Sequence, residues 1–449
     1  MNRKKIRKFI PPGKVITLSF GAMILLGALL LMLPVSTRDG KGAAFFDALF
    51  TSTSATCVTG LVLHDTWNYW SYFGQFVILL LIQIGGMGVV TMGMAVFSFT
   101  GRKIGLRQRY VMQESISAPQ MGGIMRLTSF ILKATAIFEG TGMLLLAIRF
   151  IPKLGFEKGL WFSLFHSVSA FCNAGFDLMG DNSDFSSLTT YSGDVVVNLV
   201  VMALIVIGGI GFFVWHDIYT HRLRFKVYRL HTKLVLVTTL ILLAVPAFYL
   251  FFAEFSRPEW GLGNIRERLL ASLFQTVTPR TAGFNTVNLS AMSSSSQGIM
   301  ILLMLIGGSP GSTAGGMKTT TFAVLLANIV ATYRQQDSAH FFDRRIDYNA
   351  IKLASTILTM YIALFFWGGI FISAYENLPL SSCLYETASA LGTVGLTLGI
   401  TPQLHVPSQL ILILLMYLGR VGSLTLMYAA LSGKKAVNSK LPLEKITIG

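Results

Sequence analysis

Hydrophobic residues along this chain fall into long runs that are separated by shorter, more polar segments. Several runs approach the roughly 20 residues that an α-helix needs to cross the hydrocarbon core of a bilayer. Between them lie apolar runs of roughly 10–14 residues, which are too short to cross and more often form re-entrant or buried segments. The alternation of long and short runs predicts an all-α polytopic membrane protein.

One composite pattern occurs four times along the chain: a long apolar run, a short apolar run, a polar segment that ends in glycine, and a second long run. This pattern divides the chain into repeat one (1–100), repeat two (101–220), repeat three (221–345), and repeat four with the C-terminal tail (346–449). The first long runs are 15–35, 127–151, 234–255 and 351–374, and the short runs are 44–55, 160–170, 266–277 and 381–391. The second long runs are 75–97, 195–215, one that begins near 299, and 410–431.

The four units have the same internal order and the same orientation. A re-entrant loop brings irregular backbone to membrane depth, which is tolerated only where protein buries it or where it lines a water-filled cavity. Four span–pore-loop–span repeats therefore predict four loops around one central pore per chain. A carrier built from inverted repeats is the competing architecture, and it would predict two halves of opposite topology.

The composition agrees with a membrane protein and locates its two sides. Hydrophobic residues make up 53% of the chain, charged residues 12%, and the formal net charge is +16. Most lysines and arginines lie in 1–14, 101–126, 217–233, 332–352 and the tail from 433, and these segments alternate with segments poor in positive charge. The positive-inside rule then places both termini in the cytoplasm. The charge needs no nucleic-acid partner, although a basic cytoplasmic face could also dock an acidic partner or anionic lipid.

The polar segments have the chemistry of a cation filter. Glycine lets backbone carbonyl oxygens approach an axis closely, and a short helix that ends at the loop directs its negative dipole end toward a cation. In repeat four, 393–395 read Thr-Val-Gly, as at the start of the potassium-channel filter. The alternative for any single copy is a helix cap or turn. The predicted filter residues, with an ion held at their carbonyls, are Cys57, Val58, Thr59, Gly60, Cys172, Asn173, Ala174, Gly175, Arg280, Thr281, Ala282, Gly283, Gly392, Thr393, Val394 and Gly395.

The second long run of repeat three is interrupted halfway by glycine, serine and proline, which cannot continue a helix. We expect this loop to lie in the pore as a gate, the alternative being a static kinked helix. Arg420, in the last span, is costly at mid-membrane and usually marks an ion pathway. Free carbonyls of the loop are its expected partners, and structural packing is the alternative role. The predicted gate residues are Gly307, Gly308, Ser309, Pro310, Gly311, Ser312, Thr313, Ala314, Gly315, Gly316, Lys318 and Arg420.

Three acidic residues follow the second polar segment on the outer side: Asp177, Asp181 and Asp184. They could concentrate cations at the mouth of the pore. An ordinary solvated loop is the other interpretation.

Taken together, the four glycine-ended segments and the interrupted span resemble the superfamily of K⁺ transporters that includes the Trk, Ktr and plant HKT proteins, most closely the KtrB-type membrane subunit. The filter glycines of that family fall on Gly60, Gly175, Gly283 and Gly395. The resemblance implies K⁺ uptake through the filter, with K⁺ preferred because Gly60 is not serine. It also implies that the 308–316 loop gates the pore and that Arg420 forms an electrostatic barrier to cations.

The resemblance further implies a homodimer in the cytoplasmic membrane of a bacterium, with a separate nucleotide-binding ring of the KtrA type as regulator. No cofactor is expected in this chain itself, so nucleotide is expected only on that partner. Because only repeat four keeps Thr-Val-Gly, the ring should select less sharply, which allows some Na⁺ passage. Passive and Na⁺-dependent transport both stay open, and a Na⁺-selective or poorly selective channel of the same family is the alternative. A remote alternative is an intramembrane serine hydrolase, since 307–311 fit G-x-S-x-G around Ser309 and His166 lies in a re-entrant run.

Overall fold

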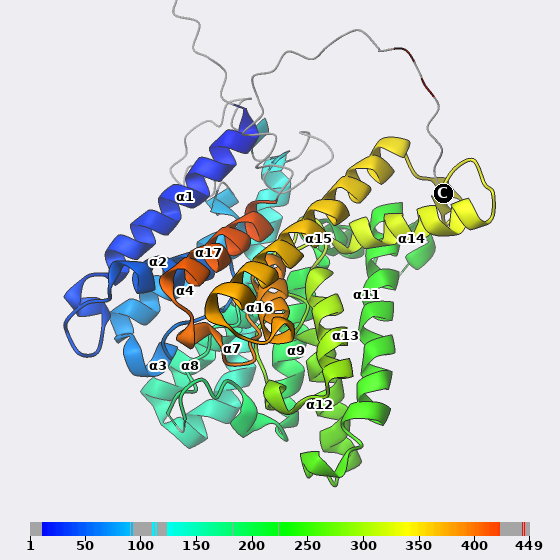
Figure 1. Cartoon of the computed structure of the whole chain (residues 1–449). Helices are drawn as coiled ribbons and strands as arrows, with labels where there is room; N and C mark the ends of the chain where they lie inside the picture. Colours follow the sequence, from blue (N-terminus) through cyan, green and yellow to red (C-terminus); the bar gives the residue numbers. More distant parts are fainter. Residues whose placement is uncertain are drawn as a thin grey trace, which may run out of the picture.

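The computed structural model describes residues 11–89, 91–92, 110–111, 113–114, 124–181, 183–222, 224–422, 442 and 444, and it is largely helical (Figure 1). Among these described residues, four helices are long and apolar enough to cross a membrane, or five spans if the bent pair 195–210 and 212–221 counts as one. The four long helices begin the four repeats, as the sequence predicts. These helices are α1 (Pro12–Leu31), α7 (Ile124–Leu154), α11 (Leu230–Tyr249) and α15 (Tyr348–Glu376).

A short helix follows each long helix and packs against it. The four short helices are α2 (Phe45–Thr56), α8 (Phe156–Phe171), α12 (Ile265–Val277) and α16 (Leu380–Gly392). Each ends within one residue of the predicted end of its short apolar run. We call these four the pore helices.

The third helix of each repeat is shorter than the first helix of that repeat. These helices are α4 (Tyr72–Met87), α9 (Val195–Ile210), α13 (Ser294–Leu305) and α17 (Val406–Val421). The prediction of uninterrupted second spans in repeats one, two and four was wrong. Helices α4, α9 and α17 stop at Gly88, Gly211 and Gly422, whose φ angles are 87°, 100° and 89°. Positive φ cannot continue a right-handed helix and is the conformation that glycine provides. After its break, α9 continues as α10 (Phe212–His221) at an angle of 95°.

Repeat three has the predicted interruption, between α13 and α14 (Thr319–Tyr333). Strands β1 (His340–Phe341) and β2 (Arg344–Arg345) then form a small antiparallel hairpin, with His340 opposite Arg345. The remaining helices are short turns: α3 (Thr66–Tyr69), a π-turn (Leu250–Glu254) that extends α11, and the 3₁₀ turns Pro34–Ser36, Thr189–Tyr191, Phe225–Val227, Pro258–Trp260, Leu289–Ala291 and Thr401–Gln403.

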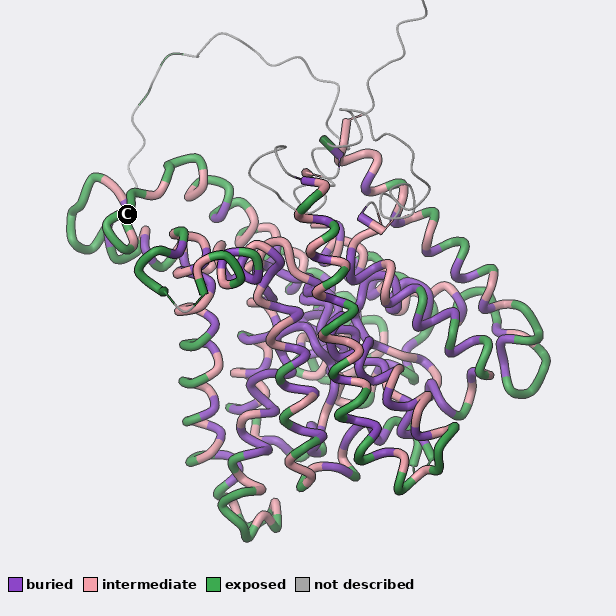
Figure 2. Tube along the Cα trace, turned by 180° about the vertical axis from the view of Figure 1, so that it is seen from behind, coloured by how far each residue is buried: buried purple, intermediate pink, exposed green. Residues whose placement is uncertain are grey.

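Burial is concentrated at the centre of the helix assembly, while the long outer helices expose apolar side chains (Figure 2). Large residues such as Leu18 on α1, Leu144 on α7 and Phe248 on α11 are each about two-thirds exposed, at 68%, 67% and 68%. The serines and threonines that lead into the filter segments are fully buried instead. An apolar exterior, with polar side chains buried inside among apolar ones, is the arrangement expected of a protein whose surface faces lipid.

Candidate functional site

The four filter glycines form a closed ring. A Cβ atom added to any one of them would lie far inside contact distance of a carbonyl oxygen on the next segment, so only glycine allows this approach. The distances from the added Cβ to the carbonyl oxygen follow the ring in order: 2.4 Å from Gly60 to Ala174 O, 2.7 Å from Gly175 to Ala282 O, 2.5 Å from Gly283 to Val394 O, and 2.2 Å from Gly395 to Thr59 O.

The four segments share one backbone conformation although their side chains differ. Each filter glycine has a positive φ, and so does the residue two positions before it: Val58 at 58°, Asn173 at 59°, Thr281 at 66° and Thr393 at 52°. Left-handed backbone at non-glycine residues costs on the order of 1–3 kcal/mol and persists where the surrounding structure fixes it. The fourfold repetition of this conformation is therefore a property of the ring and not of one local sequence.

Each pore helix ends directly before its filter segment and directs the negative end of its dipole toward the ring. Backbone hydrogen bonds continue from the helix into the segment. The amide of Thr59 donates to Ser54 O at 2.8 Å, and Ala174 and Val394 make the same bond to Ser169 and Ser389 at 2.8 Å. In the shorter third segment Ala282 donates to Thr278 O at 2.9 Å. The ring thus combines carbonyl oxygens, close approach and negative potential, which together suit a partly dehydrated cation.

The residues that accept these backbone bonds also carry hydroxyl groups, and the bonds of these hydroxyls divide the four repeats into two pairs. The residues are Ser54, Ser169, Thr278 and Ser389. In repeats one and four, Ser54 Oγ and Ser389 Oγ each accept the amide of the filter glycine at 3.0 Å. In repeats two and three the hydroxyl donates to the carbonyl after the glycine: Ser169 to Phe176 O at 2.7 Å, and Thr278 to Phe284 O. Two carbonyls just beyond the glycine ring are therefore held by their own pore helix, so the fourfold symmetry ends there.

A second repeated motif, which our sequence reasoning missed, supports the pore helices. The breaks of the third helices read Ile-Gly-Gly-Met-Gly at 84–88, Ile-Gly-Gly-Ile-Gly at 207–211, Ile-Gly-Gly-Ser-Pro-Gly at 306–311 and Leu-Gly-Arg-Val-Gly at 418–422. The first glycine packs against the end of a pore helix in three repeats: a Cβ at Gly85, Gly208 or Gly419 would lie 2.0–2.1 Å from a carbonyl oxygen. Aligning the repeats on these glycines would have revealed the motif.

This packing predicts a loss of stability in Gly208→Ala. The added Cβ would lie 2.0 Å from Phe171 O, and a backbone carbonyl cannot move aside without displacing the filter segment. We expect a loss of at least about 1–3 kcal/mol in stability, measured as a lower melting temperature of the detergent-solubilised protein. Gly140→Ala is the matched control, because a Cβ at Gly140 in α7 meets nothing within 4 Å. Equal melting temperatures for the two variants would contradict the packing argument.

The interrupted segment of repeat three lies against the filter and against the break of α9. Thr313 Oγ1 donates to Phe171 O at 3.0 Å and contacts Asn173 Oδ1 at 2.9 Å. The amide of Ser309 donates to Gly209 O at 2.9 Å. A Cβ on Gly315 would lie 2.1 Å from Thr393 Oγ1, so the loop also lies next to the fourth filter segment. The loop is therefore packed next to the filter, held by hydrogen bonds to repeat two.

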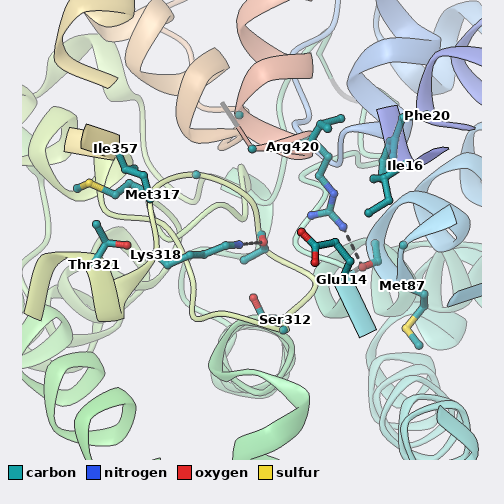
Figure 3. Close-up of a pocket in the computed structure, with 18 of the residues that line it drawn as sticks. Ile16, Phe20, Met87, Glu114, Ser312, Met317, Lys318, Thr321, Ile357 and Arg420 are labelled. Atoms are coloured by element: carbon teal, nitrogen blue, oxygen red, sulfur yellow. Dashed lines mark hydrogen bonds between the residues drawn. The ribbon is translucent and has the colours of Figure 1, made fainter. Parts of the chain in front are cut away.

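Arg420 joins this loop to repeat one (Figure 3). It occupies the place of the second glycine in the repeated motif, and its guanidinium donates to Thr313 O, as expected for a loop carbonyl. It also donates to Gly85 O and, at 2.9 Å, to Gly86 O, two partners that the sequence did not suggest. Lys318 Nζ donates to Ala314 O at 2.8 Å. Two cationic side chains thus hold one loop at the edge of a common cavity.

This cavity has a volume of about 300 Å³, and the helix breaks of all four repeats contribute to its lining. Arg420 and Lys318 line it, and Glu114 is the carboxylate among its lining residues (Figure 3). The loop, Arg420 and Lys318 therefore lie together at one cavity, and the same loop packs against the second and fourth filter segments.

The serine and the histidine of the hydrolase alternative have separate partners. Ser309 Oγ pairs with Thr319 Oγ1 at 2.9 Å, whereas His166 contacts Phe162 O and the amide of Leu178. A hydrolase would need the serine and histidine in contact, and this contact is absent from the described part of the chain. The three cysteines are buried and free.

The acidic residues after the second segment also have local partners. Asp181 pairs with Lys158, and Asp184 accepts from Asn68. Asp177 accepts the amide of Met179 at 3.0 Å. Asp181 is thus paired with a cation, and Asp177 follows the filter glycine of repeat two by two positions. A role of these carboxylates at the mouth of the pore stays a prediction.

Comparison with known proteins agrees with this arrangement. A family model described as TrkH, cation transport protein, matches residues 14–437. The chain is 40% identical to the potassium/sodium uptake protein NtpJ of Enterococcus hirae, over 100% of this chain and 99% of that protein. It is 42% identical to the Ktr system potassium uptake protein B of Bacillus subtilis, over 94% of this chain and 93% of that protein.

The fold is also that of a solved transporter. The potassium transporter TrkH from Vibrio parahaemolyticus superposes with a TM-score of 0.74 at 16% identity, over 95% of this chain and 86% of that chain. With the family match over nearly the whole length, the chain belongs to the TrkH family of cation transport proteins.

Proposed function

We propose that this chain takes up K⁺ through the ring of four filter segments, as the membrane subunit of a Ktr-type system. The observation that carries the proposal is the closed ring of glycines, in which each segment brings a carbonyl oxygen against the next. Carbonyl oxygens in that arrangement can replace the hydration shell of a cation. The names of two relatives, a Ktr potassium uptake protein B and a potassium/sodium uptake protein, support K⁺ as the main cargo.

The same arrangement supports a direction and a gate. The basic segments 217–233 and 332–352 follow the break at Gly211 and the 307–316 loop along the chain, through α10 and α14, and the positive-inside rule favours the cytoplasm for that side. We therefore place both termini in the cytoplasm of a bacterium and the protein in its cytoplasmic membrane. K⁺ would enter at the filter and leave through the cavity, once the loop and Arg420 move aside.

We also propose two partners on the basis of the Ktr relatives. One is a second copy of this chain, each copy keeping its own pore, since four segments of one chain already complete the ring. The other is a cytoplasmic nucleotide-binding ring of the KtrA type, with the nucleotide on that ring. The exposed basic hairpin β1–β2 and the 217–233 turn offer it a positively charged surface.

A Na⁺-permeable channel is the second candidate, because the ring is not fully symmetric. Two of the carbonyls beyond the glycines are held by hydroxyl groups, and three of the four segments lack the Thr-Val-Gly sequence. Fewer equivalent oxygens should discriminate less sharply between K⁺ and Na⁺. Some Na⁺ passage is compatible with the main proposal, whereas a preference for Na⁺ is not.

The test is ⁸⁶Rb⁺ uptake into liposomes that hold the purified chain, with K⁺ or Na⁺ as the competing ion. We expect K⁺ to inhibit uptake at concentrations at least about tenfold lower than Na⁺ does. If the chain alone shows no uptake, adding the KtrA-type cytoplasmic ring should start it. Equal inhibition by both ions would favour the poorly selective channel, and stronger inhibition by Na⁺ would overturn the K⁺ assignment.

A further inference from the structure

A buried carboxylate lies behind the fourth filter segment. Glu386, on α16, is fully buried and accepts a hydrogen bond from Thr397 Oγ1 at 2.9 Å and another from Thr401 Oγ1. Thr397 Oγ1 in turn accepts the amide of Gly399 at 2.9 Å. Within the described ranges, no lysine, arginine or histidine forms an ion pair with Glu386. Its carboxylate is satisfied by the hydroxyls of the chain that follows the filter.

The contact holds the filter segment from its outer side. Gly395 is already fixed on its other side, where its amide donates to Ser389 Oγ at 3.0 Å. Thr397 follows Gly395 by two positions, so its bond to Glu386 restrains the chain just after the filter glycine. Two side chains of one pore helix, Ser389 and Glu386, therefore restrain the fourth segment at Gly395 and two positions after it.

The other three repeats have no carboxylate at the equivalent position of their pore helices. Repeat one has Thr51 there. Repeat two has His166, whose Nδ1–H donates to Phe162 O at 2.7 Å, which leaves Nε2 to accept the backbone amide of Leu178 at 3.4 Å. Repeat three has Gln275, which is fully buried with neither amide atom hydrogen-bonded. At this position only repeat four has a carboxylate, and it accepts from side-chain hydroxyls of the chain after the filter.

We propose that Glu386 is a positioning residue for cation selectivity, which acts through Thr397 to fix the fourth filter segment. This rests on the proposed function, because it assumes that the ring is the filter. A filter distinguishes K⁺ from Na⁺ by the spacing and number of its oxygens. The segment that Glu386 holds contributes Val394 O to the ring, so releasing its outer end lets the ring adapt to the smaller ion.

The experiment measures ⁸⁶Rb⁺ uptake into liposomes by the full chain, with its cytoplasmic partner if uptake requires one, and compares inhibition by K⁺ and Na⁺. Glu386→Gln removes the charge and one hydroxyl acceptor, and Thr397→Val removes the hydroxyl at constant size. Both should lower the ratio of Na⁺ to K⁺ inhibition constants about tenfold. Thr397→Ser keeps the hydroxyl, so this variant should keep the ratio of the unmodified chain.

Glu376→Gln is the matched control. Its side chain, also in repeat four, is 4% exposed, but its carboxylate pairs with His405 at 2.7 Å, and its hydrogen bonds within the described residues include those from His405 and none to the filter segment. An unchanged ratio in a transporting Thr397→Val or Glu386→Gln variant would overturn the proposal, as would an equal loss in Thr397→Ser. If Glu386→Gln does not fold, the two Thr397 variants decide alone. Absence of K⁺ discrimination in the unmodified chain would instead contradict the proposed function.

Discussion

Replacing Gly395 with alanine should abolish K⁺-selective uptake. A Cβ at this position would lie 2.2 Å from Thr59 O and 3.0 Å from Gly60 Cα, and the φ of 92° is unfavourable for alanine. Neither backbone contact can be relieved without opening the ring. We expect selective ⁸⁶Rb⁺ uptake to fall at least about 100-fold, since overpacking of about 3 kcal/mol corresponds to a factor of this size. Gly60→Ser should behave similarly, because its Cβ would lie 2.4 Å from Ala174 O.

The control for this prediction is Gly298→Ala. Gly298 lies in α13, has no neighbour within 4 Å of an added Cβ, and lies in helical backbone that alanine favours. It should fold and transport as the unmodified chain does. If Gly395→Ala folds and keeps selective uptake at the level of Gly298→Ala, the ring of glycines is not the filter.

The sequence was sufficient to predict the ring because its signal is local and repeated. A short apolar run followed by a small polar segment must dip into the membrane in each repeat, whatever its neighbours do. The ends of all four pore helices were therefore predicted to within one residue, at Thr56, Phe171, Val277 and Gly392. The third segment is one residue shorter, and its backbone bond from Ala282 to Thr278 absorbs the difference.

The features that escaped prediction depend on contacts between repeats. Hydropathy cannot distinguish an unbroken span from one that a glycine breaks, so the ends of α4, α9 and α17 were missed. The partners of Arg420 in repeat one lie more than 300 positions away in the chain and follow only from the closed arrangement of repeats. In the same way, Ser54 and Ser169 occupy equivalent positions, yet one accepts a hydrogen bond and the other donates one.

Replacing Arg420 with glycine should raise cation flux through the resting protein. Glycine stands at the equivalent place of the other three helix breaks, at Gly86, Gly209 and Gly308, so the variant matches the repeat. It removes the guanidinium bonds to Thr313, Gly85 and Gly86 and one of the two positive charges at the cavity. Two unit charges repel by roughly 1–4 kcal/mol at about 4 Å, depending on the surrounding dielectric. We therefore expect ⁸⁶Rb⁺ uptake by the chain alone to rise at least about tenfold.

Arg420→Lys separates the two ways in which the arginine could close the pore. Lysine keeps the positive charge but lacks the planar fork that spans carbonyls of two repeats. If the charge forms the barrier, Arg420→Lys should stay closed while Arg420→Gly opens. If both variants open, the hydrogen bonds that hold the loop are the barrier and the charge is secondary. Both variants could also show unaltered uptake while their melting temperatures and elution volumes match those of the unmodified chain. That result would contradict a gating role and leave Arg420 as a packing contact between repeats one, three and four.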